Sequence, residues 1–214
     1  MKRMLVSVMV VLLAGIFPAR ANLIMNGDFE EGNTAFLSEL VYSPGDITPP
    51  TTYDIVLNPA DSHYSCASYT DHTGGGYMLA ANGSLEPDDI VWSQTVEVQE
   101  NTLYELAFWL SSWSSLDSPV IVLDVVINGS NVLNSCNVPP TGGVWEHWST
   151  VWFSGNSESA EIDFINTSTK YYGCDFAIDD ISLVIVPEPT TLLLLGLGAA
   201  MVRRRRSQSL LSRS

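Results

Sequence analysis

Basic residues are nearly absent from the middle of this 214-residue sequence. The chain has nine lysines and arginines in all, and only Lys170 lies between residues 22 and 186. That span holds 23 of the 24 acidic residues, so its net charge is close to −22. A surface of this sign repels nucleic acid and anionic lipid, and we therefore expect no nucleic-acid partner. The same charge favours cations, and salt screens its self-repulsion.

Signatures of catalysis are missing as well. The sequence has no Gly-x-Ser-x-Gly nucleophile elbow and no His-Glu-x-x-His zinc motif. The run Gly74-Gly75-Gly76 lacks the lysine and the strand-to-helix context of a phosphate-binding loop. With 23 acids, a pair of glycosidase-like carboxylates could always be chosen, so such a pair indicates nothing. We therefore expect that the protein is not an enzyme.

Cysteines are too few for a disulfide framework. Cys66, Cys136 and Cys174 allow one bridge and one remaining thiol, and an exported setting permits the bridge. The sequence does not choose among the three pairings.

The N-terminus has the three parts of a secretory signal peptide. Lys2 and Arg3 precede an uncharged apolar run over residues 4–17, and Ala19-Arg20-Ala21 then offers small residues at a cleavage site. The apolar run is too short to span a bilayer. The pattern predicts a signal peptide over residues 1–21, helical before it is removed by cleavage after Ala21.

The C-terminus begins with Pro187, Glu188 and Pro189, followed by an apolar run over residues 190–202. A basic cluster then stops the run; its members are Arg203, Arg204, Arg205 and Arg206. Thirteen residues fall short of the roughly 20 that a stable spanning helix needs. The arginines would remain on the cytoplasmic side. A short apolar helix of this kind suits a sorting tag that is held briefly in the membrane and then removed.

Residues 186–206, VPEPTTLLLLGLGAAMVRRRR, resemble the PEP-CTERM sorting signal of Gram-negative bacteria. The resemblance implies a sorting signal over residues 187–214, transient anchoring in the inner membrane, and cleavage near Pro-Glu-Pro by an exosortase-type membrane protease. It implies a final location at the cell surface or in the extracellular matrix, in bacteria that often make extracellular polysaccharide. One departure is the tail SQSLLSRS after the arginines, which is longer than usual.

The span 22–186 has the size and pattern of one all-β domain. Short runs rich in Val, Ile, Tyr, Phe and Trp alternate with turn residues, and Asn128-Gly129 is a strong hairpin signal. No long segment has a helical period. We expect an antiparallel β-sandwich of the jelly-roll type, with its first and last strands in one sheet or meeting at one edge. Residues 33–76 are the least regular and are expected to carry long loops.

The opening segment NLIMNGDFEEG and the closing segment FAIDDISLVIV resemble the first and last strands of galactose-binding-like jelly rolls, the fold of many carbohydrate-binding modules. In those modules an N-terminal acidic residue and an aspartate of the last strand often share a structural calcium ion. The resemblance places Glu30 and Asp179 in that role, with Asp28 and Asp180 as lesser candidates. Calcium needs six to eight converging oxygen ligands. The alternative is that these carboxylates are merely solvated.

Aromatic side chains indicate a sugar-binding face. Trp109 lies on the opposite strand face from Phe108 and Leu110, and Trp113 follows in a serine-rich stretch where burial is less expected. Tyr69 and His72 lie in the long-loop region. We predict glycan binding by Tyr69, His72, Trp109 and Trp113, and the alternative is that these rings belong to the core.

These observations together predict an exported, non-catalytic envelope or matrix protein that binds extracellular polysaccharide and is stabilised by calcium. Two alternatives remain open, a small secreted glycan-active hydrolase and a structural matrix protein with no ligand.

Overall fold

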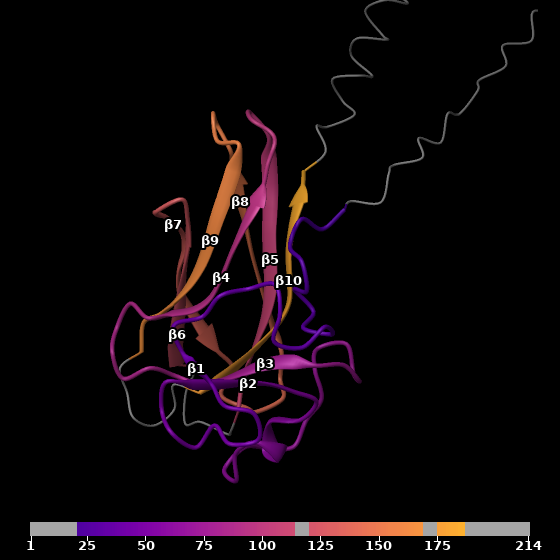
Figure 1. Ribbon diagram of the computed structural model, residues 1–214, viewed down its shortest axis with the longest axis vertical. Coiled ribbons are helices and arrows are strands. Elements are labelled where there is room, and N and C mark those ends of the chain that lie inside the picture. Colours follow the sequence, from indigo (N-terminus) through magenta and orange to yellow (C-terminus); the bar gives the residue numbers. More distant parts are fainter. Residues whose placement is uncertain (1–20, 114–119, 169–174, 187–214) are drawn as a thin grey trace, which may run out of the picture.

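The computed structural model describes residues 21–113, 120–168 and 175–186 (Figure 1). The predicted sorting signal, nearly all of the predicted signal peptide, and the two helices expected there lie outside these ranges. Within them, no helix is long and apolar enough to span a membrane. The helix content of the described residues is one 3₁₀ turn, η1 (Pro59–Asp61).

Two β-sheets face each other in a sandwich, which confirms the predicted all-β jelly-roll class (Figure 1). Neighbouring strands are antiparallel except for the β1–β2 pair. The six-stranded sheet has the order β1 (Val41–Tyr42), β2 (Thr52–Val56), β3 (Met78–Asn82), β10 (Phe176–Ile185), β5 (Leu103–Ser112), β8 (Glu146–Phe153). The four-stranded sheet has the order β4 (Ile90–Glu97), β9 (Ser159–Asn166), β6 (Val120–Ile127), β7 (Ser130–Val138). β1 and β10 therefore share one sheet, although the predicted first strand was the opening segment, which precedes β1.

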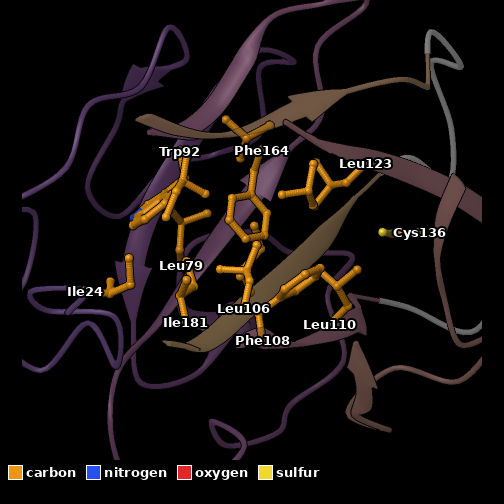
Figure 2. Packing of buried hydrophobic residues seen from close by; sticks show 14 of the residues in the cluster. Ile24, Leu79, Trp92, Leu106, Phe108, Leu110, Leu123, Cys136, Phe164 and Ile181 are labelled. Carbon is orange, nitrogen blue, oxygen red and sulfur yellow. The ribbon is translucent and has the colours of Figure 1, made fainter. Parts of the chain in front are cut away.

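Period-two alternation decides which side chains fill the space between the sheets. On β5, Tyr104, Leu106, Phe108 and Leu110 are fully buried, whereas the residues between them are only partly buried. Phe108 packs edge-on against Phe164 with ring centroids 4.7 Å apart (Figure 2). Burying each such side chain contributes roughly 1.5–3 kcal/mol to stability. The odd-numbered residues of β5, Trp109 included, are thereby directed to the outer face of the six-stranded sheet.

The opening segment is not the regular strand that its sequence suggested. Asn26 and Phe29 have positive φ angles of 52° and 56°, which break the extended conformation. The segment still extends the sheet beside β10, because Leu23 N donates to Leu183 O and Ile181 N donates to Gly27 O. The first residues of the domain therefore lie against its last strand.

The region 33–76 contains more structure than its composition predicted. β2 has five consecutive buried residues, among which the polar Thr52 and Asp54 alternate with Tyr53 and Ile55. The predicted Asn128-Gly129 hairpin is confirmed between β6 and β7, and both residues have the positive φ that its turn type requires. Cys66 and Cys136 are free thiols, so the pairing between them is not formed. Cys174 lies outside the described residues.

Candidate functional site: two adjoining hollows beside β10

An irregularity in β10 brings two aspartates to one place. The β10–β5 register runs to Asp179, opposite Trp109, and resumes only at Ser182, opposite Ala107. Asp180 lies in this bulge with a φ of 51°. Consecutive strand residues normally point to opposite faces, but ligand atoms of Asp179 and Asp180 lie within 4.8 Å of each other and of His72.

The first hollow is acidic and measures about 320 Å³. Five carboxylates border it, and they include all four residues predicted to hold calcium. The structure thus brings together the beginning and the end of the domain and adds a loop residue that the sequence analysis missed. The carboxylates belong to Asp28, Glu30, Asp71, Asp179 and Asp180, and the remaining lining is Thr73, Gly75 and Gly76.

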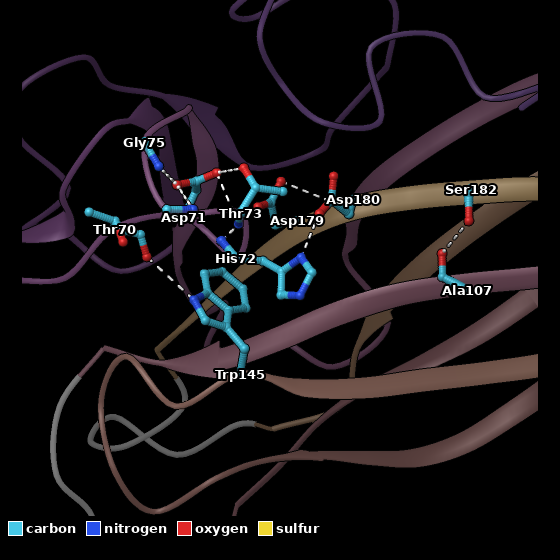
Figure 3. Close-up of polar contacts among 11 residues, drawn as sticks. Thr70, Asp71, His72, Thr73, Gly75, Ala107, Trp145, Asp179, Asp180 and Ser182 are labelled. Carbon is cyan, nitrogen blue, oxygen red and sulfur yellow. Dashed lines mark hydrogen bonds and ion pairs between the residues drawn. The ribbon is translucent and has the colours of Figure 1, made fainter.

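Backbone amides of the loop 71–77 hold two of these carboxylates in place. Asp71 accepts hydrogen bonds from Gly74 N at 2.9 Å, from Gly75 N, and from the Thr73 hydroxyl (Figure 3). Glu30 Oε1 accepts one from Tyr77 N at 2.7 Å. A Cβ on Gly76 would lie 1.9 Å from Glu30 Oε1, so any other residue there would displace this carboxylate. The stretch DHTGGGY was the signal for Asp71, since clustered glycines let a loop wrap around a carboxylate.

Burial and neighbouring carboxylates make the ionised form of Asp179 unfavourable unless a positive charge is close to it. Burial raises the pKa of Asp179 to about 8, helped by the nearby charges of Asp180 and Asp71, although amide hydrogen bonds from His72 and Asp180 oppose the rise. Asp179 is only 1% exposed. Burial also acts to raise the pKa of Asp71. Hydrogen bonds from Thr73 and from the loop amides outweigh this effect, so the pKa is lowered. The described ranges contain no lysine or arginine that could pair with Asp179, and a proton or a bound cation would neutralise it.

Hard oxygen donors in this number fit the ligand set that calcium prefers. Asp179 is buried and Glu30 is oriented by a backbone amide, while the group of ligand atoms within 4.8 Å of one another consists of Asp179, Asp180 and His72.

The second hollow, of about 380 Å³, lies on the outer face of the sheet. Small side chains line it in the middle, where Ala107 on β5 is opposite Ser182 on β10, and the Ser182 hydroxyl faces Ala107 O (Figure 3). Trp109 and His147, which are paired across β5 and β8, provide aromatic surface. The N-terminal segment contributes Asn22, Asn26 and Asp28. Asp28 and Asp180 border both hollows.

His72 connects the two hollows. Its ring stacks on Trp109 with centroids 3.7 Å apart and planes 16° apart. Its Nδ1 lies 2.6 Å from Asp180 Oδ2 (Figure 3). Trp145 meets the same imidazole edge-on and donates from Nε1 to Thr70 O. The imidazole of His72 thus covers one face of Trp109, and the indole still lines the second hollow.

The other two predicted sugar-binding rings are placed differently. Tyr69 is half-buried and packs against Trp145, with ring centroids 6.1 Å apart. Trp113 is 1% exposed, within a second cluster of buried residues that includes Ile47 and Met78. The expectation that Trp113 avoids burial was wrong, because Ala67 N bonds to Trp113 O and the 59–69 loop covers the end of β5. A ring with no exposed face offers none to a sugar.

The C-terminal residues 186–206 match the family description "PEP-CTERM protein-sorting motif". This match confirms the sorting signal and marks the chain for export and processing by an exosortase. No curated protein sequence matches the chain.

Solved structures share the fold at low sequence identity. The CBM22-1 xylan-binding domain of Paenibacillus barcinonensis Xyn10C is similar with a TM-score of 0.52 and 16% identity, over 79% of this chain and 99% of that one. A Stig cyclase, Fisc from Fischerella sp. TAU, has a TM-score of 0.55 and 12% identity over the same shares. The arabinose-bound α-L-arabinofuranosidase MgGH51 has a TM-score of 0.52 and 14% identity, over 78% of this chain and 26% of that one. The fold is thus that of carbohydrate-binding modules, and it also occurs in a cyclase.

Proposed function

We propose that this exported, exosortase-processed chain is a non-catalytic polysaccharide-binding protein whose sugar site is the hollow at Trp109 and whose fold is stabilised by a calcium ion in the acidic hollow. The observation that carries the proposal is the adjacency of the two hollows. They share Asp28 and Asp180, and His72 contacts both Asp180 and Trp109.

Sugar binding follows from the chemistry of the second hollow. Sugar rings pack their C–H faces on aromatic rings, and their hydroxyls need polar partners close by. Trp109 and His147 supply rings, while Asn22, Asn26 and Ser182 supply amide and hydroxyl groups. The small side chain of Ala107 leaves room for a ring to approach the sheet. The likeness to a xylan-binding domain supports the fold of such a module, and this chain's own residues must supply its specificity.

Calcium would stabilise the fold by joining the two ends of the domain. Glu30 belongs to the N-terminal segment and Asp179 to β10, with Asp71 in the loop between β2 and β3. An ion held by these three residues would join the N-terminal segment, the glycine-rich loop and the last strand. It would also offset the burial and, after it, the neighbouring carboxylates that raise the pKa of Asp179.

The non-catalytic part of the proposal rests on the role of the carboxylates. An ion in the acidic hollow engages the buried acid whose raised pKa could otherwise suggest a general acid. The alternative function is a glycan-active enzyme. Because the fold also occurs in a cyclase, catalysis has to be tested directly.

A glycan array tests the proposal. The processed chain, residues 22 to about 189, should bind at least one class of polysaccharide or oligosaccharide and leave it intact. Binding should be stronger in calcium than in chelator. Absence of binding across a broad array would overturn the sugar-binding role, and release of reducing ends from a bound glycan would overturn the non-catalytic role.

A further inference from the structure

The hollow at Trp109 is acidic, and the described ranges contain no lysine or arginine to balance it. Asp28 and Asp180 border the hollow. Asp28 is exposed, and its Oδ1 accepts a long hydrogen bond of 3.5 Å from Glu30 N. The basic groups of the described residues are imidazoles, of which His147 lines the hollow and His72 is bonded to Asp180.

We infer that the preferred ligand is a polysaccharide that carries free amino groups, such as a polymer of hexosamines without their N-acetyl groups. The inference rests on the proposed function and names the class of sugar that the same site selects. The sugar ring packs in the hollow at Trp109, and its ammonium group lies between Asp28 and Asp180. Hydrogen bonds between a charged donor and a carboxylate are stronger than those between neutral groups.

Anionic sugars fit this hollow poorly. Proteins hold carboxylate and sulfate groups with arginine or lysine, and the described residues contain neither. A uronic acid placed here would meet Asp28 and Asp180 at close range. The charge of the whole domain, close to −22, acts in the same direction, because it repels a polyanion and draws a polycation towards the surface.

Calcium in the acidic hollow does not reverse this preference. Five carboxylates border that hollow, and one divalent ion leaves most of their charge in place if they are ionised. Asp28 and Asp180 are the two that also border the sugar hollow, so part of the residual charge lies where the sugar amine would be. The test is therefore carried out with calcium present throughout.

A matched pair of ligands tests the inference by isothermal titration calorimetry. The glucosamine trisaccharide and its N-acetylated counterpart have the same ring and linkage and differ only at nitrogen. The processed chain should bind the free-amine form roughly tenfold more tightly at a pH below the pKa of the sugar amine. The difference should disappear at a pH above it. Trp109→Ala should lose both ligands.

A charge-matched pair of variants separates the site from general attraction of a cation to an acidic protein. Asp28→Asn and Glu97→Gln each remove one negative charge, and Glu97 is an exposed residue of β4 in the other sheet. Only Asp28→Asn should remove the preference for the free amine. The melting temperature in calcium shows that each variant is folded.

The remaining outcomes of these titrations overturn the inference, and one of them also overturns the proposed function. Equal affinity for both trisaccharides overturns the inference and leaves the proposed sugar site intact. Equal losses in Asp28→Asn and Glu97→Gln also overturn it, because the preference would then come from net charge. If these ligands and every neutral glycan fail to bind, the proposed function falls as well.

Discussion

His72 and Trp109 form a stacked pair, with ring centroids 3.7 Å apart and planes inclined by 16°. The imidazole comes from the loop before β3 and the indole from β5. The same imidazole lies 2.6 Å from Asp180. The stacked imidazole thus covers one face of the tryptophan, and the remaining surface of the indole lines the hollow at Trp109.

Replacing His72 with Ala should weaken glycan binding by about three- to tenfold without removing it, because Trp109 keeps its hollow but loses the ring that supports it. Calorimetric titration with the best ligand of the array measures the change. The control is His63→Ala, whose ring stacks on Tyr64 away from the hollow and should not alter affinity. Equal affinity of His72→Ala and the wild-type protein would show that the stack does not position Trp109.

Calcium should raise the melting temperature well above the value in sodium chloride of the same ionic strength. An ion that binds only the folded state stabilises it by about 2.7 kcal/mol at a hundredfold excess over its dissociation constant. Asp179→Asn should remove most of the difference, and Glu97→Gln should keep it. Identical melting temperatures in the two salts would mean that the acidic hollow holds no ion.

The glycine-rich loop provides a second test of the calcium site. In Gly76→Ala, the new Cβ would lie 1.9 Å from Glu30 Oε1 and would displace that carboxylate from Tyr77 N. Gly75→Ala is the matched control, because nothing lies within 4 Å of a Cβ there. Thermal melts with and without calcium should show a reduced calcium effect in the first variant alone. A calcium effect unchanged in Gly76→Ala would exclude Glu30 as a ligand.

Asp175 should make the protein less stable as the pH rises. Burial raises its pKa to about 6, although a hydrogen bond from the Gly83 amide opposes this. The value for the unfolded chain is about 3.9, so the folded state binds the extra proton between these values. Below about pH 4 the acid is protonated in both states and carries no penalty. As the pH passes through 6, the folded state must ionise a buried group, at a cost of at most about 3 kcal/mol.

Melting curves from pH 4 to 8 in chelator check this sign. The melting temperature of wild-type protein should fall over the range relative to that of Asp175→Asn, and the variant should be the more stable of the two at pH 8. Parallel curves for the two proteins would contradict the raised pKa.

Much of the architecture was predictable because β-strands carry it. Period-two alternation in β5 identified Trp109 as outward-facing, and Asn128-Gly129 identified a hairpin. β2 was missed although Tyr53 and Ile55 alternate with polar residues, because four alternating residues are a short signal within a segment rich in turn formers. Trp113 was misplaced because exposure after the end of a strand depends on which distant loop covers it, and sequence spacing carries no such information.

The acidic hollow was predictable only in part. Asp28, Glu30, Asp179 and Asp180 were grouped because the first and last strands of related folds are neighbours, and the structure places all four around one hollow. Asp71 was not predicted to belong to the hollow, because its position depends on a loop with tight backbone turns. The bulge at Asp180, which brings it beside Asp179, has no mark in the sequence.

The most direct measurement of the central claim is the affinity of the processed chain for its best array ligand, compared between wild type, Trp109→Ala and Tyr64→Ala. Tyr64 is 85% exposed and lies outside both hollows, so its variant controls for loss of any surface aromatic ring. Trp109→Ala should lower affinity at least tenfold at an unchanged melting temperature in calcium, and Tyr64→Ala should bind like wild type. Full affinity in folded Trp109→Ala would contradict the placement of a sugar site in this hollow.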